Sequence, residues 1–187
     1  MTEKRVYNFS AGPSMLPVAV LEKAAKQMLN YEGSGMSVME MSHRSSSYLD
    51  IFEKTKGLLK KVMNVPENYK IVFIQGGATQ QFSMVPLNLL KNGKADYAIT
   101  GAFSKKAATE AKKYGDIHIV NNFKHIPTQD ELKLDPEASY VHLCANNTIY
   151  GTEWKYVPET NGVPIIADMS SNILSKPVDV SKYGMIY

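Results

Sequence analysis

Apolar side chains recur along this chain in two different patterns. From Pro17 to about Asn30, and again from Tyr48 to about Met63, they return at helical spacing, which predicts two amphipathic helices. Gly33 and Gly35 follow the first of these segments and are expected to end it. The serine-rich stretch between the two helices has no apolar period and is predicted to be a loop.

Short continuous apolar runs bounded by turn residues predict strands that are buried on both faces, as in a parallel sheet. Such runs lie at 71–74, 95–100, 117–120, 139–144 and 164–167, and another begins at 183–187. Helical patterns separate several of these runs, one after Gly77 and one after Ser104, which is predicted to cap its helix. The alternation predicts an α/β fold, built as a three-layer, mainly parallel sheet with helices on both faces.

Two regions of different character are expected. Residues 1–16 predict a loop-like amino-terminal arm, because Asn8–Pro13 is too rich in turn formers for a helix or a strand. Residues 17–187 are numerous enough to bury one sizeable core and are predicted to form a single large domain.

Four polar features follow predicted strands, and the carboxyl ends of parallel strands are where such sheets bind ligands. The features are Gly77–Ala78–Thr79, Gly101–Ala102–Phe103, Asn147–Thr148 and Asp168. The first of them leads into a helix, whose free backbone N–H groups and positive dipole end attract an anion. It is therefore interpreted as a phosphate-binding cup, with an ordinary Gly-Gly connector as the alternative.

The chemistry of this edge depends on its side chains. Asp168 ends an apolar run and needs a partner for its carboxylate; it is either a helix cap, with Ser170 and Ser171 behind it, or the group that holds a protonated ring nitrogen. Phe103 either stacks on a flat cofactor or packs in the core, and Thr148 either contacts a ring substituent or closes a turn. A phosphate cup, an aromatic platform and a buried carboxylate together predict pyridoxal 5′-phosphate as the cofactor.

His43 and Arg44 lie in the serine-rich loop, where an arginine can bind the carboxylate or phosphate of a substrate. A solvated loop charge is the alternative. The histidines have no helical metal-ligand spacing and Cys144 is the single cysteine, so no metal site is predicted.

Composition narrows the class of protein. The chain has 187 residues, of which 44% are hydrophobic and 21% charged, as in a soluble globular protein. Its formal charge of +3 comes with scattered lysines, so no nucleic-acid partner is expected. No run approaches the roughly 20 apolar residues that span a membrane, and the polar amino terminus is unlike a signal peptide; we expect a cytoplasmic protein without a membrane partner.

Six short motifs, in order along the chain, resemble those of the phosphoserine aminotransferases. They are Asn8–Pro13, Ser42–Ser45, Gly76–Phe82, Val85–Asn88, Asn147–Gly151 and Ala167–Ser171. The resemblance implies a class V aminotransferase of PLP fold type I, a cytoplasmic homodimer that exchanges an amino group between L-glutamate and 3-phosphohydroxypyruvate. The implied setting is L-serine biosynthesis and, in many bacteria, pyridoxine biosynthesis.

The resemblance also implies roles for individual residues. Those that would contact the cofactor are Gly77, Ala78 and Thr79 at its phosphate, Thr148 at its ring hydroxyl and Asp168 at its ring nitrogen. Phe103 stands where the family usually has a tryptophan stacked on the ring. Ser10, His43 and Arg44 would meet the substrate.

One departure from the family pattern concerns the Schiff-base lysine, which has no counterpart in this chain. Lys176 and Lys182 have flanking residues that match noncatalytic positions of the family. The family's small carboxyl-terminal domain has no counterpart either. The resemblance therefore implies the amino-terminal half of such an enzyme, truncated before the lysine and inactive by itself.

Two other interpretations are open. One is a different fold type I enzyme, such as a cysteine desulfurase or an alanine–glyoxylate transaminase, against which Asn8–Pro13 and Ser42–Arg44 argue. The other is a non-catalytic chain that needs a second chain, which the missing lysine favours. A nucleotide-binding domain is disfavoured because neither of the usual glycine-rich phosphate motifs is present.

Overall fold

The computed structural model describes residues 5–10, 12–122 and 125–187. The chain divides into two compact units, Met1–Val62 and Met63–Tyr187. Parts of the predicted arm, residues 1–4 and Ala11, lie outside the described residues.

The first unit contains two α-helices, α1 (Val18–Gln27) and α2 (Ser46–Val62), with the short 3-10 helix η1 (Val38–Glu40) between them. Both predicted helices are confirmed, and Pro17 occupies the position immediately before α1. Ser37 caps the start of η1 in two ways. Its hydroxyl accepts from the Met39 N–H, and its backbone N–H donates to the Glu40 carboxylate. Neither α1 nor α2 has a buried residue.

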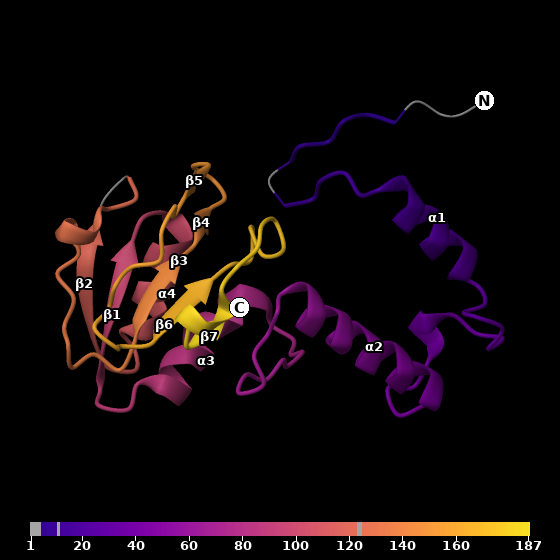
Figure 1. Ribbon diagram of the computed structural model, residues 1–187, viewed down its shortest axis with the longest axis horizontal. Coiled ribbons are helices and arrows are strands. Elements are labelled where there is room, and N and C mark those ends of the chain that lie inside the picture. The colour runs from indigo at the N-terminus through magenta and orange to yellow at the C-terminus, as the bar shows by residue number, and fades with distance from the viewer. Residues whose placement is uncertain (1–4, 11, 123–124) are drawn as a thin grey trace. The chain divides into compact units, whose positions relative to one another are not determined.

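The second unit is an α/β structure (Figure 1). Its α-helices are α3 (Gly77–Leu89) and α4 (Ala102–Ala111), and its strands are β1 (Lys94–Ile99), β2 (Asp116–Asn122), β3 (Val141–Cys144), β4 (Asn146–Asn147), β5 (Thr152–Glu153), β6 (Ile165–Asp168) and β7 (Met185–Ile186). Five strands form one sheet in the order β2-β1-β3-β6-β7, and every pair in it is parallel. The predicted α/β fold with a mainly parallel sheet is confirmed.

The direction of the strand order changes between β1 and β3. From β1 the chain passes to β2 on one side, and it then returns to place β3, β6 and β7 on the other side. Loops that leave the two central strands diverge at such a point and open a crevice at the carboxyl edge. The crevice marks where a ligand is expected in this topology.

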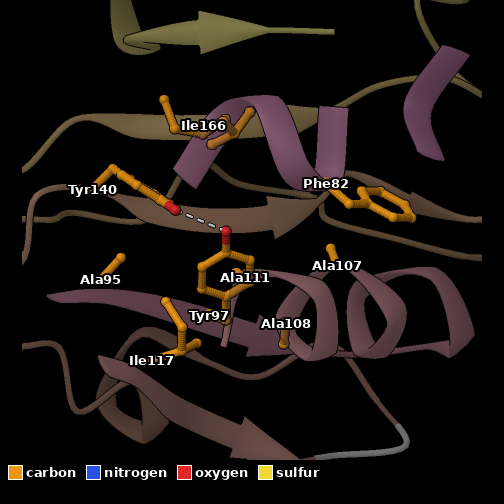
Figure 2. Packing of buried hydrophobic residues seen from close by; sticks show 10 residues of the cluster. Phe82, Ala95, Tyr97, Ala107, Ala108, Ala111, Ile117, Tyr140 and Ile166 are labelled. Carbon is orange, nitrogen blue, oxygen red and sulfur yellow. Dashed lines mark hydrogen bonds between the residues drawn. The ribbon is translucent and has the colours of Figure 1, made fainter. Parts of the chain in front are cut away.

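One face of the sheet packs against α3 and α4. Tyr97 and Tyr140 are both 1% exposed in this core, and their hydroxyl oxygens lie 2.8 Å apart (Figure 2). Three alanines of α4 let that helix approach the strands closely; they are Ala107, Ala108 and Ala111. The paired hydroxyls satisfy each other, so two large phenols can be buried without a lone polar group.

The opposite face has a different cover. Adjacent residues of a strand point to opposite faces, so Ala98 and Ile165 belong to a second apolar cluster, together with Trp154 and Met169. Segments without α-helix supply this cover from the second unit. They include Leu132 and Tyr183, which directly follow the 3-10 helices η2 (Gln129–Glu131) and η3 (Val180–Lys182). Within the described part of residues 63–187 the α-helices therefore contribute to one face only.

The predicted strand at 71–74 was wrong, because this stretch pairs with no strand among the described residues. Val72 is 71% exposed and Ile74 is 54% exposed. A strand is held by backbone hydrogen bonds to a neighbour, and an apolar run cannot show whether a neighbour is available. Tyr69 still anchors the stretch, since its hydroxyl donates to the Tyr183 carbonyl at 2.6 Å.

Candidate functional site

Hydrogen bonds link the segments that follow β1 and β3 at the carboxyl edge of the sheet. The Thr100 hydroxyl donates to Asn147 Oδ1 at 3.2 Å, and Asn147 Nδ2 donates to the Thr152 hydroxyl at 2.9 Å. Thr100 and Asn147 are 2% and 3% exposed, so the bond between them forms away from solvent. A Cβ atom at Gly101 would lie 2.5 Å from Asn147 Oδ1, so only glycine fits there without a shift.

Ser104 completes the turn from β1 into α4. Its hydroxyl oxygen lies 3.0 Å from the backbone nitrogens of both Thr100 and Gly101, which donate to it. The sequence predicted Ser104 as the residue that begins the helix, but α4 begins two residues earlier, at Ala102. Ser104 therefore caps from inside the first turn, and Gly101 occupies the capping position.

Phe103 lies in the first turn of α4, close to this fastened edge. Its side chain is 36% exposed, so a flat group can reach its ring. Lys106, one turn further along α4, places its ammonium nitrogen 5.4 Å from the ring centroid. The Phe103 ring is therefore partly exposed and has Lys106 as a neighbour.

Asp168 ends β6, directly beside the end of β3. Its backbone carbonyl accepts from the Ala145 N–H at 2.8 Å, and Cys144 is its register partner. The following loops are also joined, because Asn146 Nδ2 donates to the Ser171 hydroxyl at 2.8 Å. The features that follow β1, β3 and β6 consequently lie along one continuous edge.

The Asp168 carboxylate is 4% exposed. Its Oδ1 accepts from the Ser170 N–H at 3.0 Å and from the Ser170 hydroxyl at 2.6 Å. These bonds close a turn and not a helix cap, because the next helix in the described structure is η3. Within the described residues Oδ2 accepts no hydrogen bond and no cation pairs with the carboxylate. A buried carboxylate without a counter-ion is costly, and a cationic ligand atom would relieve that cost.

The charge of Asp168 also affects its neighbours. Burial, reinforced by this carboxylate, raises the pKa of the Cys144 thiol to about 12. The same two causes, burial first, raise the pKa of the Tyr187 hydroxyl. Both groups are therefore neutral near pH 7, and neither is an activated nucleophile.

The start of α3 supplies donors for an anion. Gly76 precedes the helix with φ = 103°, a left-handed conformation that favours glycine. The first bond of the helix runs from the Gln80 N–H to the Gly76 carbonyl at 3.3 Å, so the N–H groups of Gly77, Ala78 and Thr79 have no acceptor within it. Thr79 is exposed and Ala78 is half-buried.

A pocket of about 370 Å³ connects this helix start with the Asp168 loop. Gly77 and Ala78 line it from α3, Ser170 lines it from the loop after β6, and Tyr187 lines it from the end of β7. Ser170, which donates to the Asp168 carboxylate, therefore borders the same space as the anion donors of α3. The pocket is the geometric link between two features that are far apart in sequence.

Thr148 follows Asn147 at the turn of the β4–β5 hairpin and is half-buried. The hairpin itself was predicted only as a polar loop, because two strands of two residues each leave no periodic signal. Its turn is closed by the Gly151 N–H, which donates to the Asn147 carbonyl at 2.8 Å. Thr148 is thereby held at the carboxyl edge of the sheet, next to Asn147.

Ser10, His43 and Arg44 belong to the first unit, so their predicted meeting with the substrate stays a prediction. Ser10 is held in a tight loop, because its N–H and its hydroxyl both donate to Asn8 Oδ1, at 3.1 and 2.8 Å. His43 and Arg44 are exposed in the turn that leads into α2, where the Arg44 N–H donates to the Ser42 hydroxyl at 3.3 Å.

Two side chains that organise the edge, Asn147 and Ser170, were not predicted from the sequence to do so. Asn147 was assigned to a loop without a role for its amide, and Ser170 was considered only as part of a helix cap. The signal available in the sequence was a polar residue soon after a buried strand. Such a side chain can form hydrogen bonds that hold the neighbouring loop. Among the described residues, no three potential ligand side chains come together at a metal site. No helix there is both long and apolar enough to cross a membrane.

Comparison with known proteins shows the family of the chain that carries this edge. The model of the aminotransferase class-V family matches residues 6–187, which is almost the whole chain. The chain belongs to the class-V aminotransferases. Curated members of this family that resemble it include the phosphoserine aminotransferase of Bacillus cereus, 52% identical over 98% of this chain, and that of Pseudomonas entomophila, 51% identical over 98%.

Solved structures of class-V aminotransferases share the fold. A phosphoserine aminotransferase studied for radiation damage of its Schiff base superposes with a TM-score of 0.92 at 48% identity, over 98% of this chain and 52% of that chain. A PLP-bound phosphoserine aminotransferase from Trichomonas vaginalis has a TM-score of 0.91 at 40% identity, over 97% of this chain and 53% of that chain. The chain spans about half the length of the relatives it matches, 53% of the Bacillus cereus protein.

Proposed function

We propose that this chain carries the cofactor-binding part of a pyridoxal 5′-phosphate-dependent phosphoserine aminotransferase. The complete protein would exchange an amino group between L-glutamate and 3-phosphohydroxypyruvate in L-serine biosynthesis. The observation that carries this proposal is the 52% identity to the Bacillus cereus enzyme, which runs over 98% of the chain. A cytoplasmic homodimer, with a pyridoxine-pathway role in bacteria that have one, completes the proposal.

The residues of the edge fit this cofactor. A buried carboxylate that lacks a counter-ion suits a protonated pyridine nitrogen, and free N–H groups at a helix start suit a phosphate. The pocket of about 370 Å³ that Gly77, Ala78 and Ser170 line is within the range of small-ligand sites. When bound, pyridoxal 5′-phosphate supplies an electron sink for the carbon next to the transferred amino group.

The roles of the residues follow from their positions. Gly77, Ala78 and Thr79 would donate to the phosphate through backbone N–H groups, and Thr79 could add its hydroxyl. Asp168 would hold the proton on the ring nitrogen, because a nearby negative charge favours the cationic form of the ring. Ser170 keeps the Asp168 carboxylate in one orientation through its two hydrogen bonds.

The other two contacts would act on the faces and substituents of the ring. Phe103 would lie against a ring face, which its 36% exposure permits. Thr148 would donate to the ring hydroxyl from the turn of the β4–β5 hairpin. Since Phe103 has a smaller ring than the tryptophan usual in the family, we expect weaker stacking and a less firmly held cofactor.

Substrate recognition would come from the first unit. Arg44 can bind a phosphate or carboxylate through two parallel hydrogen bonds, with His43 beside it. Ser10 would add a hydroxyl from the loop that Asn8 closes. These three side chains supply anion recognition, whereas the edge of the second unit supplies cofactor chemistry.

The proposal is tested by the amino-donor and amino-acceptor preference of the full-length protein. We expect rapid transfer from L-glutamate to 3-phosphohydroxypyruvate, and a kcat/KM for glyoxylate or pyruvate that is lower by at least about 100-fold, since those acceptors lack the phosphate. Preference for glyoxylate, or sulfur release from L-cysteine, would reject this assignment in favour of another class-V activity.

A further inference from the structure

A pair of polar side chains, one buried and one partly buried, lies beside Asp168 and is not among the proposed cofactor contacts. The Nε2 atom of His142, on β3, lies 2.8 Å from the hydroxyl oxygen of Tyr187, which follows β7. His142 is 1% exposed and stacks on Tyr97, with ring centroids 4.6 Å apart and an interplanar angle of 13°. The imidazole is therefore fixed in position from one face and at one nitrogen.

The register of the sheet places this pair next to the Asp168 carboxylate. His142 pairs with Ile166 and Cys144 pairs with Asp168, so all four side chains share one face. Tyr187 follows Ile186, the register partner of Ala167, and therefore lies on the same face beside Asp168. Since β6 separates β3 from β7, the Tyr187 phenol must cross β6 to reach His142.

The protonation of His142 determines which atom donates in this pair. Burial lowers the pKa of His142 to about 3, so the neutral imidazole carries one N–H near pH 7. The other ring nitrogen, Nδ1, is buried and has no hydrogen-bond partner in the described part of the chain. An unpaired buried N–H is costlier than an unpaired lone pair, which favours the tautomer with its proton on Nε2.

This tautomer leaves a donor free. If Nε2–H donates to the Tyr187 oxygen, the phenol proton cannot also point at His142 and must find another acceptor. The register places Asp168 on the same face beside it, and the negative charge of this carboxylate acts on the Tyr187 hydroxyl, whose pKa it helps to raise. Tyr187 also lines the pocket that Gly77, Ala78 and Ser170 border.

We propose that His142 and Tyr187 form a positioning pair, in which His142 donates from Nε2 to the phenol oxygen and thereby directs the Tyr187 hydroxyl proton toward the Asp168 carboxylate. A hydroxyl proton that points toward the Asp168 carboxylate stabilises its ionised form, which is the form that pairs with a protonated ring nitrogen. This consequence for ligand binding rests on the proposed function, whereas the hydrogen-bond direction does not.

The direction of the hydrogen bond is tested first, without any ligand. Long-range proton–nitrogen NMR correlations of the ¹⁵N-histidine-labelled chain distinguish the two tautomers, and His142→Gln assigns the signal. We expect one neutral tautomer with its proton on Nε2. In Tyr187→Phe the Nε2 proton loses its acceptor, so the correlation pattern should change. Tyr140→Phe is the matched control, because it removes the hydroxyl of another tyrosine in the same core, one that bonds to Tyr97 instead.

The functional consequence is tested with pyridoxine 5′-phosphate, a probe that keeps the ring and the phosphate but has no aldehyde to react with lysines. Tyr187→Phe should weaken its binding roughly three- to tenfold, as expected when one polar group that stabilises the Asp168 carboxylate is lost. Tyr140→Phe should leave the affinity within about twofold. His142→Gln, whose amide can still donate to Tyr187, should bind more tightly than His142→Leu.

Each outcome decides between the alternatives. A proton on Nδ1, or equal effects of Tyr187→Phe and Tyr140→Phe, would overturn the positioning pair. A proton on Nε2 in a chain that binds no probe would support the pair and reject the proposed cofactor site. A proton on Nε2 together with a selective loss in Tyr187→Phe would support both.

Discussion

At the scale of single residues, the charge on Asp168 organises the site. The carboxylate is almost fully buried, one oxygen is used by Ser170, and no cation accompanies it in the described structure. Such a group makes the protein alone less stable and at the same time prepares it for a cationic ligand. The charge on Asp168 should therefore favour binding of a cationic ligand and lower the stability of the protein without it.

Asp168→Asn separates these two effects. In the full-length protein, kcat should fall by at least about 100-fold, as when a group that stabilises charge in the transition state is removed. The free energy of unfolding without cofactor should not fall, because asparagine keeps the acceptor for Ser170 and removes an uncompensated charge. Steady-state kinetics and urea denaturation measure the two quantities. Undiminished turnover would contradict the role given to Asp168.

Arg44 is expected to act mainly on substrate binding. Arg44→Ala in the full-length protein should raise the KM for 3-phosphohydroxypyruvate by roughly 10- to 100-fold, the value of a lost charge-assisted contact, with a smaller change in kcat. Lys54→Ala removes another exposed cation of the same unit and is the control. Equal KM values in the two variants would show that any nearby positive charge suffices, or that Arg44 is only a solvated loop charge.

His142 predicts how stability depends on pH. Burial lowers its pKa from the ordinary histidine value of 6.5 to about 3 in the folded chain, so below about pH 6.5 the unfolded chain binds a proton that the folded chain does not. The free energy of unfolding should then fall as the pH is lowered, by up to about 1.4 kcal/mol per pH unit. Denaturation of the wild type and of His142→Gln at pH 6 and 5 isolates this contribution, because the variant should show a shallower slope.

At the scale of elements, the site depends on how closely β1 and β3 are joined at their carboxyl ends. The junction has two parts. A buried hydrogen bond joins Thr100 to Asn147, and the Asn147 side chain lies so close to Gly101 that a Cβ atom there would not fit. The sequence predicted both strands and the polar residues after them. It did not show that the asparagine side chain crosses from one strand end to the other.

Gly101→Ala tests this junction. The backbone of Gly101 is extended, with φ = −171°, so the cost should come from the contact with Asn147 and not from backbone strain. We expect a loss of about 1–3 kcal/mol in the free energy of unfolding, typical of an overpacked site. Gly57→Ala, within α2 and with no atom within 4 Å of the added methyl group, is the control and should stabilise its helix by up to about 1 kcal/mol. Similar behaviour of both variants would show that the approach at Gly101 is not tight.

The elements that could be predicted share a common property. Helices α1 and α2 and strands β1, β2, β3 and β6 each carry their signal within the segment itself, as a period or a buried run. The stretch at 71–74 carries the same apolar run, yet it forms no strand because a strand depends on a partner elsewhere in the chain. For the same reason the pocket shared by Gly77 and Ser170 could be anticipated only through the rule that strand ends meet at one edge.

At the scale of the whole molecule, stability is distributed unevenly between the two units. The apolar clusters of the core belong to the second unit, whereas the helices of the first have no buried residue. The predicted cofactor contacts lie in the unit with the core, and the predicted substrate contacts lie in the other.

Hydrogen exchange of the chain should reflect this distribution. Amides of β1, β3 and β6 should be the slowest to exchange, because they are buried and bonded on both sides within the sheet. Amides of α1 and α2 should exchange at least about 100-fold faster, since their opening exposes little apolar surface. Mass-spectrometric exchange measures both sets in one experiment. Equal protection would show that the first unit shares the stability of the sheet.

The central claim is that the ends of β1, β3 and β6 and the start of α3 form one cofactor site. The most direct measurement is an NMR titration of the ¹⁵N-labelled chain with pyridoxine 5′-phosphate, followed at the backbone amides. We predict saturable shifts that are concentrated at Gly77, Ala78, Gly101, Phe103, Thr148 and Ser170, with Asp168→Asn reducing the affinity. Shifts that do not saturate, or that fall on amides away from this edge, would contradict the claim.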